Sequence, residues 1–265
     1  MIDLHNHLLP GIDDGAPDLD TALAMARLAV ADGIEVVACT PHIYPGLYAN
    51  DSAGIGAAIS ALSVQLAAAD IPLHLVAGAD THLTPDLVPR LQQGLIPTLG
   101  GSRYLLLEPP HHVAPPRFEE AVFQLMAAGY VPIITHPERL SWIETHYSMF
   151  GRLVHAGAWM QLTSGSLTGR FGRRPMYWAQ RMLDERQVHL LATDAHDLRQ
   201  RAPRLAEGRD AAAARVGEQE AVDMVSTRPR GILDNIDPGQ LPPLASVPVA
   251  AAGRPGLLRR WLRSA

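Results

Sequence analysis

The stretch that decides the fold is residues 1–15, MIDLHNHLLPGIDDG, where an apolar strand pattern carries closely spaced imidazoles and carboxylates. In an extended strand the side chains of residues i and i+2 lie on one face, so Asp3, His5 and His7 share a face. Two neighbouring imidazoles with a carboxylate behind them suit a divalent metal ion. A single His-x-His pattern also occurs at ordinary polar strand ends, so the rest of the chain must decide between the two interpretations.

Short apolar runs alternate with longer segments of helical periodicity along most of the chain. Strands are expected at residues 2–8, 35–40, 73–78, 104–108, 131–135, 159–163 and 188–193. Helices are expected at residues 19–30, 51–69, 85–93, 118–128, 143–155, 175–186 and 217–227, with Thr84 as the N-cap before Pro85. This alternation is typical of a parallel sheet with helices outside it. Seven such strands in one chain of 265 residues predict an α/β barrel, complete or distorted.

Six of the seven expected strands end on a carboxylate, an imidazole or both. The carboxyl ends of parallel barrel strands meet at one mouth, where active sites are built. Isolated buried charges are costly, and bound cations would offset that cost. The candidate metal ligands are His5, His7, Asp14, His42, Asp80, Glu108, His136, Asp194 and His196. Mixed nitrogen and oxygen donors without thiolate suit two or three Mn²⁺, Fe²⁺ or Zn²⁺ ions, the alternative being a polar mouth with one metal or none.

The composition argues against several classes of protein. The formal net charge is −5, the isoelectric point is about 6.2 and the main body has no basic block, so nucleic acid is not an expected partner. Cys39 is the single cysteine, so no internal disulfide forms and a reducing compartment is expected. The first residues lack a signal-peptide pattern and no apolar run reaches the ~20 residues of a membrane span, so we expect a cytoplasmic protein.

At these residues the sequence resembles the PHP superfamily (polymerase and histidinol phosphatase), and more narrowly the bacterial PHP-type protein-tyrosine phosphatases of capsule and exopolysaccharide clusters. The stretches that carry the resemblance run in order from Met1 to about Asn235: MIDLHNHLLPGIDDG (1–15), TPH (40–42), GAD (78–80), IPTLGGSRYLLLE (96–108), PIITHPER (132–139) and ATDAHDLRQRAP (192–203). The resemblance implies a distorted TIM-like (β/α)7 barrel of the PHP type, which agrees with the strand count.

The resemblance also implies how the candidate ligands are shared among three ions, with Mn²⁺ as the first expectation. His5, His7, Glu108 and Asp194 would hold the first ion; Asp80, Glu108 and His136 the second, with Glu108 bridging; and Asp14, His42 and His196 the third. Arg139 matches a family arginine that contacts phosphate, and Arg201 matches a second one. The chain departs from the family at Asp80, where glutamate is usual; the shorter side chain is expected to bind after a small backbone shift or through water.

The domain organisation follows from a change of composition after Asn235. We expect a PHP phosphatase domain over residues 1–235, then a Pro/Ala-rich linker and short basic tail over residues 236–265. The tail ends in LLRRWLRSA (257–265), which is too short to give more than peripheral contact with an anionic membrane. A helix docked on the body or an unfolded end are the alternatives.

Together, the residues and the resemblance predict hydrolysis of phosphotyrosine by hydroxide that the metal ions activate. Arg139 and Arg201 would bind the phosphate, and His42 or His196 could protonate the leaving oxygen. A cysteine-dependent phosphatase is excluded, because that route needs arginine six positions after the nucleophile and Pro45 stands there instead.

The implied substrate is a phosphotyrosine protein, namely a membrane tyrosine autokinase that regulates capsular or exopolysaccharide synthesis. A PHP-type small-molecule phosphatase such as histidinol phosphatase, an amidohydrolase-type barrel and a non-catalytic kinase-binding regulator remain as alternatives, and a homo-oligomer is possible. Other polar and aromatic side chains near the motifs receive ordinary interpretations. His82 is predicted to be an exposed loop histidine, and Tyr44, Tyr48, His111 and His112 are predicted to pack within loops.

Overall fold

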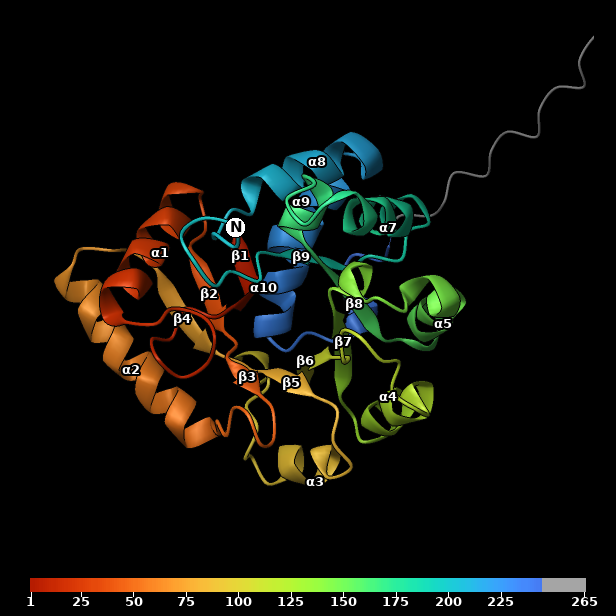
Figure 1. Cartoon of the computed structure of the whole chain (residues 1–265), viewed down its shortest axis with the longest axis horizontal. Coiled ribbons are helices and arrows are strands. Elements are labelled where there is room, and N and C mark those ends of the chain that lie inside the picture. Colours follow the sequence, from red (N-terminus) through yellow and green to blue (C-terminus); the bar gives the residue numbers. More distant parts are fainter. Residues whose placement is uncertain (245–265) are drawn as a thin grey trace, which may run out of the picture.

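The computed structural model describes residues 1–244 as a barrel of parallel strands surrounded by helices (Figure 1). The strands are β1 (Ile2–Asn6), β2 (Val36–Cys39), β3 (His42–Ile43), β4 (His74–Ala77), β5 (Asp80–His82), β6 (Tyr104–Glu108), β7 (Val131–Thr135), β8 (Trp159–Thr163) and β9 (Leu190–Ala192). They pair in the orders β1-β2-β4 and β3-β5-β6-β7-β8-β9, and each pairing is parallel. The predicted α/β architecture is confirmed.

The two sheets close into one barrel, because β2 continues into β3 and β4 continues into β5. Pro41, which has no backbone N–H, interrupts the first pair, and Gly78 interrupts the second. An added Cβ at Gly78 would lie 2.9 Å from the buried side chains of Leu99 and Thr40, so a larger residue at this bend would displace them. On the other side, a parallel bridge between Asn6 and Ala195 joins β1 to the segment after β9. Counting each broken strand once, the barrel has the seven predicted strand positions.

Helices follow most strands and cover the outside of the barrel. They are α1 (Leu19–Ala31), α2 (Ser52–Ala68), α3 (Leu87–Gln92), α4 (Phe118–Ala127), α5 (Ile143–Ala156), α6 (Ser164–Leu167), α7 (Arg173–Asp184), α8 (Ala206–Val216), α9 (Glu218–Val222) and α10 (Arg228–Leu233), with the short turns η1 (Leu99–Gly101), η2 (Pro137–Arg139), η3 (Asp223–Thr227) and η4 (Pro238–Gln240). Asp18 and Asp51 cap α1 and α2 through side-chain oxygens that accept from backbone N–H groups. Within residues 1–244, none of the helices combines the length and the apolar character that a membrane crossing needs.

Three helix predictions differ from the structure. Thr84 does not cap a helix, since α3 begins at Leu87 with Asp86 at the N-cap position. Helix α7 begins at Arg173, two residues earlier than expected, and the segment 217–227 is α9 followed by the π-helical turn η3. Helix α8 was not predicted because its alanine-rich sequence shows no continuous apolar stripe. Its packing depends on Gly208, where an added Cβ would lie 2.4 Å from the Cβ of Ser164.

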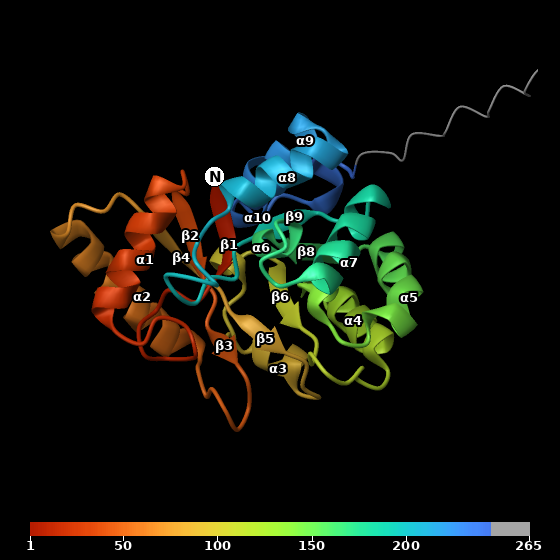
Figure 2. The same cartoon turned by 45° about the horizontal axis from the view of Figure 1, so that its top comes forward.

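The amino ends of the strands meet in an apolar cluster that closes one end of the barrel. The first residues of six strands belong to it, all buried: Ile2, Val36, Tyr104, Val131, Trp159 and Leu190. Ile232 of α10 and Leu241 pack into the same cluster. Helices α8, α9 and α10 lie together beside β1 and β9 (Figure 1 and Figure 2). A larger cluster lies between the strands and the outer helices.

The segment after α10 lies against the barrel as far as the structure describes it. The hydroxyl of Tyr104 donates to the carbonyl of Ile236 at 2.7 Å, and the guanidinium of Arg228 donates to the carbonyls of Pro242 and Pro243. The domain boundary after residue 235 stays a prediction. The basic segment 257–265 lies outside the described residues.

Candidate metal centre

The carboxyl ends of the strands carry the polar residues, and local backbone features direct them inward. The register of β1 against β2 shifts between Asp3 and Asn6. The turn that holds Asp13 and Asp14 then folds back onto β1, where an added Cβ at Gly15 would lie 2.2 Å from the carbonyl oxygen of His7. This close approach explains why glycine follows the two aspartates.

The structure brings the nine predicted ligand residues together at this mouth. Seven of them are buried, His42 is partly buried and Asp14 is exposed. Their nitrogen and oxygen atoms form overlapping groups in which all candidate atoms lie within 4.8 Å of one another. The groups are His7–Asp14–His42–His196, His5–His7–Asp80, His5–His136–Asp194, His42–His82–Glu108 and Glu108–His111–His136. His82 and His111 therefore join the cluster although both were predicted to be ordinary loop residues.

Asp80 and Asp194 face His5 of β1 and His7, which follows the strand. The Nε2 atom of His5 lies 3.4 Å from Asp80 Oδ2 and 3.3 Å from Asp194 Oδ1. The Nε2 atoms of His5 and His7 are 3.2 Å apart. Asp80 thus reaches the centre although it is shorter than glutamate. Glu108 is grouped with His136, as the resemblance implies for the second ion, but not with His5, as it implies for the first.

A second group forms around Asp14. Its Oδ1 atom lies 3.4 Å from the Nε2 atoms of both His42 and His196. This is the set that the resemblance implies for the third ion, and His7 joins it. One carboxylate oxygen facing two imidazole nitrogens at equal distance is an arrangement that a cation can occupy.

Other side chains hold these histidines in place. Gln161 Oε1 lies 2.9 Å from Nδ1 of His5, and Asp13 Oδ2 lies 2.7 Å from Nδ1 of His7. Asp13 Oδ2 also accepts from the backbone N–H of His42 at 3.1 Å. Such contacts fix the ring orientation and leave the other nitrogen free for a metal. Gln161 was not predicted, because it lies inside β8 and not at the end of the strand. Asp13 could have been predicted from the sequence, because it directly precedes the candidate ligand Asp14.

Two candidate ligands stand where the backbone takes a left-handed conformation. His136 has φ 33° and Asp194 has φ 51°, values that non-glycine residues adopt at some energetic cost. His136 directly follows the last residue of β7, and Asp194 lies two residues after the end of β9. The strained backbone turns each side chain back over the mouth.

Arg139 and Arg201 flank Asp194. Arg139 Nη1 is in very close contact with Asp194 Oδ2, and Arg201 Nη2 donates to both carboxylate oxygens at 3.0 and 2.9 Å. The Arg139 guanidinium also lies 4.8 Å from the ring centre of Phe171. Both side chains are partly exposed, so they are accessible from the mouth. The two predicted phosphate-binding arginines therefore lie next to the candidate ligands.

Positively charged and negatively charged side chains lie next to one another at the mouth and shift one another's pKa values. Burial opposes the charged form of Asp194, but Arg201, His5 and Arg139 outweigh it and hold the pKa of this carboxyl well below its usual range. Burial likewise opposes protonation of His5, but Asp80 and Asp194 raise the pKa of this imidazole to about 10. Protons and guanidinium groups thus balance the buried carboxylates, a role that divalent cations can take over.

Several buried atoms at the mouth make no hydrogen bond within the described residues. They are both carboxylate oxygens of Asp80, Oε2 of Glu108, Nδ1 of His42 and Nε2 of His196. Nδ1 of His42 lies 3.3 Å from Glu108 Oε2 and 3.4 Å from Asp80 Oδ2, so these atoms face one another without satisfying one another. Buried polar atoms are normally paired. Unpaired donors of this chemistry fit divalent metal ions.

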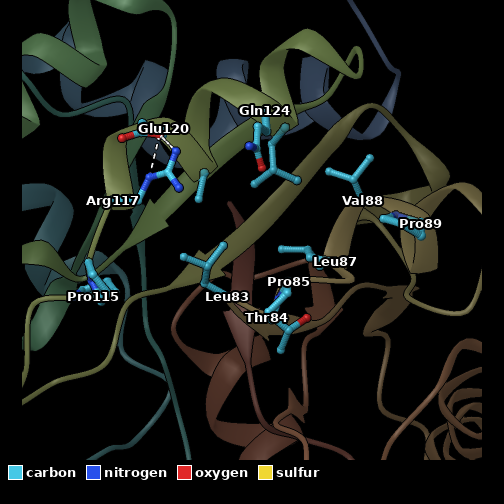
Figure 3. A pocket seen from close by; sticks show the side chains of 13 residues that line it. Leu83, Thr84, Pro85, Leu87, Val88, Pro89, Pro115, Arg117, Glu120 and Gln124 are labelled. Atoms are coloured by element: carbon cyan, nitrogen blue, oxygen red, sulfur yellow. Dashed lines mark hydrogen bonds and ion pairs between the residues drawn. The ribbon is translucent and has the colours of Figure 1, made fainter.

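A pocket of about 670 Å³ lies beside the segments that carry His82 and His111. Most side chains of the segment before α3 and of its first turn line one side, and side chains of the loop before α4 and of α4 line the other. The lining is mostly apolar or proline (Figure 3). Arg117 donates to Glu120 at its edge. The candidate ligands are not part of this lining.

Cys39 is fully buried in β2, as expected for a small apolar strand residue. Burial raises the pKa of its thiol, which makes it a poor nucleophile.

The comparisons with known proteins agree with this geometry. Residues 1–234 match the family model for capsular polysaccharide synthesis, CpsB/CapC. The chain is 37% identical over 201 residues to the tyrosine-protein phosphatase YwqE of Bacillus subtilis (strain 168), covering 76% of this chain and 79% of the relative. It is 27% identical over 240 residues to the tyrosine-protein phosphatase CpsB of Streptococcus pneumoniae, covering 88% and 98%.

Solved structures give the same result. The fold matches a structure described as one of YwqE from Bacillus subtilis and CpsB from Streptococcus pneumoniae, unique metal-dependent tyrosine phosphatases, with a TM-score of 0.86, 33% identity and coverage of 89% of this chain and 96% of that one. A D-hydantoinase matches with a TM-score of 0.51 at 13% identity, which reflects the barrel fold alone. The predicted resemblance and barrel are confirmed, and the chain belongs to the CpsB/CapC family of capsular polysaccharide synthesis proteins.

Proposed function

We propose that this protein is a metal-dependent protein-tyrosine phosphatase that acts in capsular or exopolysaccharide synthesis. The observation that carries the proposal is the cluster of buried, unpaired imidazole and carboxylate atoms with two arginines beside it. Relatives named tyrosine-protein phosphatases match most of the chain, which supports the same activity here.

The nine predicted residues are assigned to metal binding in overlapping groups. They offer two or three positions, and their nitrogen and oxygen donors suit Mn²⁺, Fe²⁺ or Zn²⁺, of which the resemblance favours Mn²⁺. When bound, such ions neutralise phosphate oxygens and lower the pKa of water so that it can attack phosphorus. Gln161 and Asp13 keep His5 and His7 oriented for this purpose.

Arg139 and Arg201 are assigned to the phosphate group. Their planar guanidinium groups present paired N–H donors that match two phosphate oxygens. Both contact Asp194 and both remain partly exposed, so a phosphate that enters the mouth meets them next to the metal positions. They would bind and orient the substrate for attack opposite its leaving oxygen.

Proton transfer to the leaving group needs little help from the protein. A tyrosine phenolate has a pKa of about 10 and departs more easily than an alkoxide. His42 and His196 remain the side chains assigned to this proton, although their Nε2 atoms face Asp14 and are assigned first to metal.

The substrate proposed is a phosphotyrosine protein, specifically a membrane tyrosine autokinase that regulates polysaccharide synthesis. We place the encounter in the cytoplasm, which agrees with a lone, buried cysteine. Association into a homo-oligomer is a further possibility that light scattering would test.

The test compares two substrates on the purified full-length chain. A phosphotyrosine peptide and histidinol phosphate are each assayed with Mn²⁺, Fe²⁺, Zn²⁺ or chelator. We expect turnover of the peptide to exceed that of histidinol phosphate by at least about tenfold and to vanish on complete metal removal. Turnover that survives chelation would refute the metal mechanism. Preference for histidinol phosphate would make the protein a small-molecule phosphatase, and metal binding without turnover of either substrate would make it a kinase-binding regulator.

A further inference from the structure

The two oxygens of Glu108 face two different pairs of histidines. Oε1 lies 3.2 Å from Nε2 of His111 and 3.7 Å from Nε2 of His136. Oε2 lies 2.5 Å from Nε2 of His82 and 3.3 Å from Nδ1 of His42. A carboxylate can bridge two cations through its two oxygens, so each side needs its own nitrogen donors.

On the Oε2 side, a neutral His42 cannot bind a cation through both of its ring nitrogens. Its Nε2 atom lies 3.4 Å from Asp14 Oδ1, in the group with His196, while its Nδ1 atom faces Glu108. A neutral imidazole has a lone pair on one nitrogen and a proton on the other. If Nε2 binds an ion beside Asp14, Nδ1 carries the proton and donates it. A cation that binds Oε2 of Glu108 then finds its nitrogen lone pair at His82, the other imidazole that faces this oxygen.

The fold holds His82 rigidly for this role. In the parallel pairing of β5 with β6, His82 is the direct partner of Glu108. Tyr44 stacks on the His82 ring with the two ring centres 4.0 Å apart and the planes 11° from parallel. Tyr44 is itself fixed by two backbone hydrogen bonds with Tyr48. His82 is therefore a strand residue with a set orientation, and the loop interpretation of it is wrong.

We propose that His82 is a metal ligand of this protein, on the Oε2 side of Glu108, in addition to the nine predicted ligands. The inference rests on the proposed function in one respect, that cations bind at this mouth. Two ligand atoms on one tetrahedral zinc ion lie about 3.3 Å apart, so the His82–Glu108 pair would separate by less than about 1 Å when an ion enters. A small rotation of the partly buried His82 side chain supplies that movement.

Crystals of the wild-type chain grown with Mn²⁺ or Zn²⁺ test the proposal without any mutation. Anomalous difference maps would locate the ions directly. We expect a peak about 2.0–2.4 Å from Nε2 of His82 and from Oε2 of Glu108. Peaks elsewhere at the mouth, with Nε2 of His82 more than about 3 Å from each of them, would overturn it.

A variant series measures the contribution in solution. His82→Gln is compared with His74→Gln, a matched control at an exposed histidine that begins β4 at the far end of the barrel. We expect His82→Gln to lose one bound ion, or to bind its weakest ion at least about tenfold less tightly in calorimetric titrations, and to alter the visible spectrum of the Co²⁺-loaded protein. The His74→Gln control should match wild type in all three measurements.

Tyr44 provides a second, milder variant that keeps the imidazole. Tyr44→Ala removes the ring that stacks on His82, and Tyr44→Phe keeps it. We expect weaker metal binding in the alanine variant and none of that loss in the phenylalanine variant. Unchanged stoichiometry, affinity and Co²⁺ spectrum in a folded His82→Gln protein would refute the role of His82. Failure of the wild-type chain to bind any divalent ion would instead refute the proposed function.

Discussion

The two ends of the barrel are built from the same strands, yet they differ in what they bury. At the amino end the first residues of six strands form an apolar cluster that α10 covers. At the carboxyl end most of these strands, or the residues directly after them, carry histidines and carboxylates, several of them equally buried and unpaired. The apolar end lowers the free energy of folding, whereas the polar end raises it until its charges are balanced. The amino end therefore stabilises the fold, and the carboxyl end holds the groups for chemistry.

The largest expected effect is at the polar end. Glu108→Gln keeps the size of the side chain but removes the charge that faces four imidazoles. We expect kcat/KM for a phosphotyrosine peptide to fall about a thousandfold, because charge stabilisation at the reacting centre is lost. The midpoint of thermal unfolding of the metal-free protein should stay within a few degrees of wild type. A Glu108→Gln protein that keeps a tenth of the wild-type kcat/KM would contradict the assignment of the chemistry to the polar end.

Trp159→Ala tests the apolar end. The indole is buried, packs edge-on against Tyr104 and stacks on His189. Its removal should cost about 3–5 kcal/mol in the free energy of unfolding by urea. The folded fraction should bind metal with the wild-type stoichiometry. Loss of metal binding at temperatures where the variant is folded would show that the two ends are coupled.

His189 makes stability at the apolar end depend on pH. Burial, aided by the positive charge of Arg228, lowers the pKa of this imidazole to about 3 in the folded protein, against about 6.5 when unfolded. The unfolded chain therefore takes up the proton first, so stability is complete above pH 6.5 and is lost as the pH falls towards 3.

For the metal-free protein, His189 should cost about 2 kcal/mol between pH 6.5 and pH 5. Asparagine can accept the hydrogen bond that the Met160 N–H donates to Nδ1 of His189, and it does not titrate. Urea unfolding of wild type and His189→Asn at pH 7.5, 6 and 5 checks the difference. Equal slopes for the two proteins would contradict the assignment.

The smallest effect is expected for Arg201→Lys. Lysine keeps the charge but not the planar guanidinium group, whose Nη2 atom donates to both oxygens of Asp194. We expect kcat/KM to fall about tenfold with metal stoichiometry unchanged. A larger loss together with loss of metal would mean that Arg201 supports the ions and not the phosphate.

The sequence was sufficient for the barrel and for the nine residues at its mouth, because a polar residue at the end of a buried strand is visible as an interruption of the pattern. His82 was missed for a physical reason. The bend at Gly78 starts a new strand, so a residue expected in a loop pairs with Glu108. Gln161 was missed because a single amide inside a strand gives no pattern, and its contact with His5 spans 156 residues.

The bridge between Asn6 and Ala195 has a consequence for how the protein is made. His5 leaves the ribosome long before its backbone partner Asp194, which follows almost two hundred residues later. The nascent chain therefore carries half of the centre long before the other half exists. Synthesis must pass Ala195 before the two chain regions join and selective loading with metal can begin.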